Sequence, residues 1–152
     1  MGSVEATKTF EGTVHEAEAC WYDTSCWGSW VEGLAEVVSV QGRWPEVGAS
    51  VRWRSGPAGR GQVSEQVVAY EPLEGQTVDV EDDSIRGRQS VAFIPASDGV
   101  EVQLSLTYEL KKRSLFSPVV DWLFIRRAFG TSLQATLTRF GAELATHRTI
   151  LG

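Results

Sequence analysis

The stretch VEVQLSLTYELK (residues 100–111) alternates apolar and polar side chains from end to end. Side chains along a strand point to opposite faces with a period of two, so this segment has one apolar face and one polar face. One dry face and one wet face are typical of an antiparallel sheet that is covered on one side only. The apolar face consists of Val100, Val102, Leu104, Leu106, Tyr108 and Leu110.

The period of two extends over residues 34–111, and further strands are predicted in LAEVVSVQG, ASVRWRSG, GQVSEQVVAYEP, GQTVDVEDDS and GRQSVAFIPAS. In ASVRWRSG, for example, Val51 and Trp53 share the apolar face. The links SGPAGRG, EPLEG, SIRG and ASDG are short and rich in turn-forming residues. Links this short favour a meander, because a parallel crossover needs about a dozen residues or more. One more strand is predicted at VEATKTF (residues 4–10).

Two short helices are predicted between the first strand and the meander. Thr13 is a suitable N-cap, and Glu16, three residues later, completes a capping box. The region around Ser25 and Gly28 interrupts this helix and begins a second one. The buried face of the first helix is expected to carry Val14, Ala17, Cys20 and Trp21.

The C-terminal part of the chain predicts one long helix. Pro118 after Ser117 is favourable at a first helical position, and no further proline occurs before about Thr146. Thirty residues of helix are about 45 Å long. A single apolar stripe is formed by Leu133, Leu137, Phe140 and Leu144.

The predicted helix is too narrow to cover the predicted sheet. A helix is about 10 Å across, whereas six strands at about 4.8 Å each make a much wider layer. The concave face of the sheet therefore retains space for large side chains, for a ligand, or for both.

Composition and charge limit the class of protein. The chain has 152 residues, 42% of them hydrophobic, and a formal net charge of −6. This length suits one domain, and the acidic charge argues against binding to nucleic acid. The first twelve residues lack the apolar core of a signal peptide, and no run is long enough for membrane insertion. With two cysteines, expected to be free thiols in a reducing compartment, we predict a cytoplasmic protein.

The common catalytic and cofactor motifs GxSxG, HExxH, GxxxxGK[ST] and GxGxxG are absent, so no cofactor is expected. No metal site is expected, since CxxC is missing and the two histidines lie at opposite ends of the chain. Strand alternation places Asp79 and Glu81 on the wet face, and Asp82 and Asp83 at a strand end. These acidic residues are interpreted as a solvated edge.

Three segments carry a family resemblance: TFEGTVHEAEACWYDTSCWGSWVEGL (residues 9–34), VVAYEPLEGQTVDVED (67–82) and SLFSPVVDWLFIRRAFGTSLQATLTRFGAEL (114–144). They are similar to the opening, the mid-sheet hairpin and the C-terminal helix of the SRPBCC/START-like superfamily, in its polyketide cyclase/dehydrase-like branch. The resemblance implies an α+β helix-grip fold, with a curved antiparallel sheet of about six to seven strands around the C-terminal helix. It also implies a single domain over residues 1–152 with a cavity between sheet and helix.

The resemblance implies binding of a small hydrophobic or amphipathic ligand, such as a lipid, a polyketide or a quinone-like molecule. The alternative is a polyketide aromatase/cyclase or dehydratase, in which Tyr70, Tyr108 or Arg88 assists proton transfer. A third hypothesis is an accessory protein that carries a lipid or quinone to a membrane complex. The expected partner is a small apolar molecule, and the chain is expected to be a monomer or a homodimer.

The tryptophans Trp27 and Trp30 have two interpretations that overlap. They either plug one end of the core, as large aromatic residues usually do, or line the mouth of the cavity. The residues predicted to line the cavity are Trp27, Trp30, Trp53, Tyr70, Phe93, Leu106, Tyr108, Trp122 and Phe129.

Overall fold

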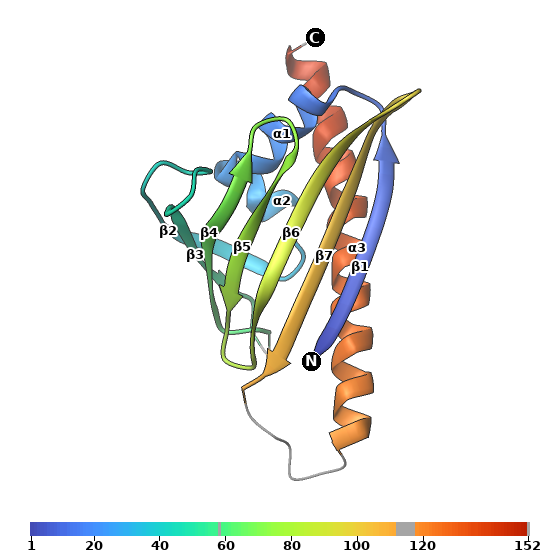
Figure 1. Cartoon of the computed structure of the whole chain (residues 1–152). Coiled ribbons are helices and arrows are strands. Elements are labelled where there is room, and N and C mark those ends of the chain that lie inside the picture. Colours follow the sequence, from blue (N-terminus) through green and yellow to red (C-terminus); the bar gives the residue numbers. More distant parts are fainter. Residues whose placement is uncertain (58, 112–117, 152) are drawn as a thin grey trace.

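Seven strands form one antiparallel sheet in the computed structural model. The structure describes residues 1–57, 59–111 and 118–151, and it does not describe the side chains of residues 118–124 and 151. The strand order is β1-β7-β6-β5-β4-β3-β2, so β2 to β7 form a meander and β1 pairs with β7 (Figure 1). The predicted antiparallel meander is thereby confirmed. The strands are β1 (Gly2–Phe10), β2 (Leu34–Gln41), β3 (Ser50–Ser55), β4 (Gln62–Glu71), β5 (Gly75–Glu81), β6 (Ile85–Ala96) and β7 (Gly99–Leu110).

The first helix, α1 (Val14–Tyr22), begins at the predicted capping box. The Glu16 backbone N–H donates to Thr13 Oγ1 at 3.1 Å, and the Thr13 N–H donates to Glu16 Oε1 at 2.9 Å. The helix ends at Tyr22 with Asp23 as its C-cap, slightly before the predicted break. The side chain of Asp23 accepts a hydrogen bond from the Ser25 N–H at 3.1 Å and so starts the turn η1 (Thr24–Cys26). The single helical turn α2 (Trp27–Trp30) follows directly.

The long helix α3 (Pro118–Leu151) starts at the predicted proline and has 34 residues, slightly more than the thirty expected. The four residues of its predicted apolar stripe, Leu133, Leu137, Phe140 and Leu144, are all buried. None of the helices in the described ranges has both the length and the apolar character that a membrane crossing needs.

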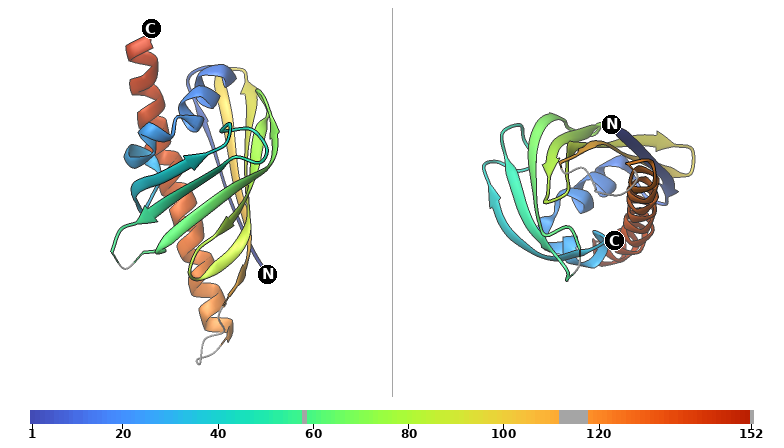
Figure 2. Two further views of the ribbon diagram at one scale, coloured as in Figure 1. Left: turned by 90° about the vertical axis from the view of Figure 1, so that its left-hand side faces the viewer. Right: turned by 90° about the horizontal axis from the view of Figure 1, so that it is seen from below.

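The sheet is curved, and α3 stands on its open side between the two edge strands β1 and β2 (Figure 2). Shifts of register in the β2–β3 and β4–β5 pairs accompany this curvature, as expected where an extra residue bends a strand. The helices α1 and α2 both pack against α3. The chain therefore has the α+β helix-grip architecture that the sequence predicted.

Phe140 of α3 lies at the centre of the aromatic core and is fully buried. Its ring makes edge-on contacts with Phe10 at 5.6 Å, Trp21 at 5.0 Å and Trp30 at 5.1 Å between centroids. Aromatic pairs in this geometry stabilise a core beyond the area that they bury. Phe140 thus joins β1, α1 and α2 to the long helix.

We expect Phe140→Ala to lower the free energy of unfolding by about 3–5 kcal/mol, because it removes a fully buried ring and leaves a cavity among rigid neighbours. Urea denaturation followed by circular dichroism measures this loss. The control, Thr138→Ala, is at an exposed position of the same helix, and its effect should stay within about 0.5 kcal/mol. Similar losses in the two variants would contradict the central role of Phe140.

Candidate functional site

A cavity of about 50 Å³ lies between the concave face of the sheet and the middle of α3. This volume suits one or two water molecules at about 30 Å³ each, whereas sites for drug-sized ligands measure about 300–1,000 Å³. Side chains therefore fill most of the hollow, and a ligand needs some of them to move. The cavity is lined by Trp21, Trp27, Trp30, Val31, Glu32, Trp53, Arg60, Glu65, Val80, Gln89, Leu104, Ser132, Leu133 and Thr136.

Three indoles from the short helices form one wall of this cavity. Trp27 and Trp30 lie three residues apart in α2 and so share one side of the helical turn. The ring of Trp30 lies 4.6 Å from that of Trp21 and 6.3 Å from that of Trp27, between centroids. The indole N–H of Trp27 donates to the carbonyl of Trp21 at 2.8 Å, which holds α2 against the end of α1.

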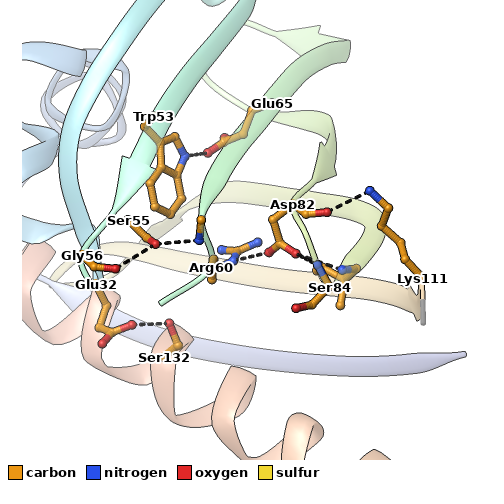
Figure 3. Close-up of polar contacts among 12 residues, drawn as sticks. Glu32, Trp53, Ser55, Gly56, Arg60, Glu65, Asp82, Ser84, Lys111 and Ser132 are labelled. Carbon is orange, nitrogen blue, oxygen red and sulfur yellow. Dashed lines mark hydrogen bonds and ion pairs between the residues drawn. The ribbon is translucent and has the colours of Figure 1, made fainter. Parts of the chain in front are cut away.

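A buried carboxyl group, that of Glu65, borders the same cavity from the sheet. Figure 3 shows it beside the indole of Trp53. Glu65 lies on β4 and alternates with Val63 and Val67 on the same face, so its side chain points to the concave face. The residue is only 8% exposed. Trp53 Nε1 on the neighbouring strand donates to Glu65 Oε2 at 2.7 Å. The other carboxyl oxygen has no hydrogen-bond partner among the described residues.

Burial raises the pKa of Glu65, because the charged form loses its hydration. The hydrogen bond from Trp53 and the positive charge of Arg60 act in the opposite direction, but burial has the larger effect. Glu65 consequently keeps its proton to a higher pH than a solvated glutamate. A protonated carboxyl group can donate a hydrogen bond or a proton to a molecule in the cavity.

The guanidinium of Arg60 is the second polar group at the cavity. It reaches inward from the β3–β4 hairpin and stacks between two rings, with Cζ 5.5 Å from the centroid of Trp53 and 5.4 Å from that of Phe129. Its Nε donates to Asp82 Oδ2 at 2.6 Å. Its Nη2 is buried and has no hydrogen-bond partner in the described part of the chain. An unsatisfied buried donor of this kind is rare in folded proteins and can receive an acceptor atom of a ligand.

Asp82 corrects the prediction that the whole acidic stretch is solvated. Its side chain is 0% exposed and accepts hydrogen bonds from the backbone N–H groups of Ser84 at 2.7 Å and Ile85 at 2.9 Å, besides the bond from Arg60. The carboxylate therefore closes the β5–β6 turn and holds Arg60 in place. The prediction is confirmed for Asp79 and Glu81, whose side chains are 52% and 44% exposed.

The rim of the cavity is closed by two hydrogen bonds between Glu32 and α3. Ser132 Oγ donates to Glu32 Oε2 at 2.8 Å (Figure 3), and the Glu32 backbone N–H donates to Thr136 Oγ1 at 3.1 Å. Glu32 belongs to the three-residue link between α2 and the edge strand β2. These two hydrogen bonds attach the link to the long helix.

Three of the residues predicted as lining, Trp27, Trp30 and Trp53, lie at this cavity. Phe93 and Leu106 are buried in the same core cluster but do not border the cavity. Both point to the concave face, as strand alternation predicted.

Tyr108, Phe129 and Tyr70, which were also predicted as lining, do not border the cavity. Tyr108 is buried and packs on the half-buried Phe129 at 5.1 Å between centroids, on the far side of Arg60. Tyr70 is half-buried and packs with Tyr22 at 5.6 Å beside a separate small cluster. The side chain of Trp122 lies outside the described residues.

Arg88, predicted as a helper in proton transfer, lies on the outer face of the sheet. Its Nε pairs with Asp79 Oδ1 at 2.9 Å, and its side chain is 59% exposed. From this outer face, Arg88 cannot assist proton transfer in the hollow. Residues 85, 87, 89, 91 and 93 share the inward phase of β6, and Arg88 lies between them.

Sequence reasoning missed the polar groups of the cavity, although part of the signal was present. Alternation with Val63 and Val67 already places Glu65 inward, and the inward phase of β6 includes Gln89. The direction of the Arg60 side chain cannot be predicted in this way, because Arg60 lies in the link between β3 and β4, where side chains do not alternate between two faces. Its direction depends on Asp82, which is distant in sequence.

We expect Glu65→Gln to change how stability depends on pH. The folded chain binds the Glu65 proton more tightly than the unfolded chain, so the free energy of unfolding falls as pH rises from the usual glutamate pKa through the raised one. The glutamine oxygen can still accept from Trp53 Nε1, but the amide does not ionise. The variant should therefore gain stability relative to the wild type as pH rises, in urea denaturation between about pH 4 and pH 8.

Glu109→Gln, at an exposed position of β7, is the matched control and should show no such gain. A difference between Glu65→Gln and the wild type that stays constant over this range would contradict the assigned environment of Glu65.

The fold has many structural relatives of low sequence identity. A protein from Thermus thermophilus is 17% identical with a TM-score of 0.76, over 95% of this chain and 98% of that chain. The di-domain ARO/CYC StfQ of the steffimycin biosynthetic pathway is 14% identical with a TM-score of 0.78, over 97% of this chain and 51% of that chain. A START superfamily protein from Mycobacterium smegmatis is 13% identical with a TM-score of 0.73, over 95% and 97%. At these identities the likeness concerns the fold alone.

No curated protein matches the sequence significantly. The family described as "Polyketide cyclase / dehydrase and lipid transport" matches residues 1–145, which is nearly the whole chain. The family resemblance seen in the sequence is thereby confirmed. This chain, with its curved sheet around a long helix, belongs to the polyketide cyclase/dehydrase and lipid transport family.

Proposed function

We propose that this protein binds a small amphipathic molecule in the hollow between the sheet and α3. The observation that carries the proposal is the composition of the cavity, which has a wall of three indoles opposite a buried carboxyl and an unpartnered guanidinium nitrogen. An apolar ligand body gains about 25 cal/mol for each Å² that it buries against such a wall. A ligand oxygen would satisfy the donor that Arg60 leaves open.

The proposed ligand has an oxygen-bearing head and an apolar body. Arg60 Nη2 is a donor and fits a carbonyl or hydroxyl oxygen, while Glu65 and the amide of Gln89 can each donate or accept. Lipids, polyketides and quinone-like molecules all share this combination. The family description, which names both polyketide chemistry and lipid transport, supports the same class of ligand.

Trp27, Trp30 and Trp53 are the lining residues that we propose to contact the body of the ligand. Tyr108 and Phe129 lie beyond Arg60 and would meet the ligand only if the hollow widens in that direction. The two free cysteines support a reducing compartment, and we propose a cytoplasmic location.

A second candidate function is an aromatase/cyclase or dehydratase activity, and the pair of Glu65 and Arg60 favours it. In a dehydration, the ionised Glu65 would remove a proton from the carbon beside a ligand carbonyl, and Arg60 would stabilise the negative charge on the carbonyl oxygen. The protonated Glu65 would then return the proton to the leaving hydroxyl group, which departs as water. The raised pKa of Glu65 suits a group that both accepts and donates this proton.

Binding is tested by titrating para-propylphenol, which has a hydroxyl head and an apolar body, into the protein. We expect saturable quenching of tryptophan fluorescence with one site per chain. Arg60→Lys keeps a positive charge beside Asp82 but removes the Nη2 donor, and it should weaken binding about five- to tenfold. The matched control is Arg54→Lys, because Arg54 is exposed on β3 and pairs with Glu36. Absence of saturable binding, or equal weakening by both variants, would contradict the proposal.

The enzymatic candidate is tested with the aldol of benzaldehyde and acetone, whose dehydration produces the strongly absorbing enone benzalacetone. We expect the wild type to accelerate this reaction and Glu65→Gln to abolish the acceleration, since the amide cannot take the proton. If both proteins bind propylphenol and neither accelerates the dehydration, this aldol activity is contradicted and the binding function stands alone.

A further inference from the structure

Glu32 separates the inner cavity from an open groove on the outside of the molecule. The groove measures about 400 Å³ and lies along α3, where it is bordered by Glu32, Arg127, Ala128, Thr131, Ser132 and Ala135. Glu32 and Ser132 border the inner cavity as well. The hydrogen bond of 2.8 Å between these two side chains is therefore part of the wall between the two spaces.

We propose that the groove and the inner cavity are two parts of one binding site for an elongated amphipathic molecule, which join when the Glu32 side chain leaves Ser132. The proposal rests on the proposed binding function and adds to it the path of access and the shape of the ligand. The oxygen-bearing head lies at Arg60 and Glu65, and the apolar chain passes Glu32 into the groove.

The volumes support a joined site. The inner cavity is walled by indoles but holds only about 50 Å³, and the groove offers about 400 Å³ but little enclosure. Small-molecule sites measure about 300–1,000 Å³, so the inner cavity alone is too small for such a ligand. The groove is large enough but lacks the indole wall, Arg60 and Glu65, so a ligand that uses these groups needs both spaces. The groove is lined by the small apolar side chains of Ala128 and Ala135, which leave room for a chain.

The local structure allows Glu32 to move at low cost. Glu32 is half-buried, so its carboxylate can be hydrated when it leaves Ser132. Gly33 follows with φ of +83°, and no atom lies within 4 Å of the position of a Cβ there. The link continues into β2, an edge strand that pairs on one side only and has two shifts of register. No regular hydrogen-bonded ladder therefore holds Glu32 against α3.

The chain length of the ligand provides the test. We expect para-hexylphenol to bind the wild type at least tenfold more tightly than para-propylphenol, because each methylene buried in the groove is worth up to about fourfold in affinity. Ala128→Trp fills the groove and should bring the ratio of the two affinities close to one. Gln134→Trp, at an exposed position of α3 outside the groove, is the matched control and should keep the wild-type ratio.

Glu32→Ala tests the barrier itself by stopped-flow fluorescence. Removal of the carboxylate should raise the association rate of para-hexylphenol about tenfold, and Glu5→Ala, on the exposed face of β1, should leave it unchanged. Thermal unfolding of each variant verifies that the fold is retained.

Equal affinities of the two phenols for the wild type, or an unchanged ratio of the two affinities in Ala128→Trp, overturn the joined site but leave the binding function in place. An unchanged association rate in Glu32→Ala overturns the barrier. If neither phenol binds, the proposed function itself fails.

Discussion

The concave face of the sheet is wider than the single helix that covers it, and the rest of the structure depends on this mismatch. Seven strands at about 4.8 Å each span roughly 30 Å, whereas a helix is about 10 Å across. An apolar face left open to water would be unstable, so other groups must cover it. The indoles of α1 and α2 form part of this cover, and Phe140 packs against Trp21 and Trp30 from the long helix. The small cavity remains where these covering elements meet.

The polar groups in this cavity are costly to bury and are not explained by stability alone. Asp82 is saturated by backbone N–H groups and by Arg60, as buried charges usually are. Glu65 and Arg60, by contrast, each retain hydrogen-bonding capacity that no described residue uses. Unsatisfied polar atoms facing an apolar wall are typical of binding and catalytic sites, where a ligand completes the hydrogen bonds. The proposed function and the proposed barrier at Glu32 both follow from this arrangement.

The sequence predicted the fold well because its signals are local. The alternation of residues 100–111, the capping box at Thr13 and the stripe of α3 each depend on neighbours in sequence, and the structure confirms all three. The site was predicted less completely, because the positions of its polar side chains depend on partners that are distant in the sequence. Arg60 is held by Asp82, and Glu32 by Ser132, one hundred residues later in the chain. Glu65 is the exception, because its alternation with Val63 and Val67 is a local signal that already places it on the inner face.

The most direct measurement of the central claim is the set of indole N–H signals in a ¹H–¹⁵N NMR spectrum during titration with para-propylphenol. The account predicts saturable shifts of the signals of Trp53, whose N–H meets Glu65, and of Trp30, whose ring faces the cavity. The signal of Trp44, which donates to Tyr22 and does not line the cavity, should move far less. Shifts that do not saturate, or that are as large for Trp44 as for Trp53, would show that the hollow does not receive the ligand.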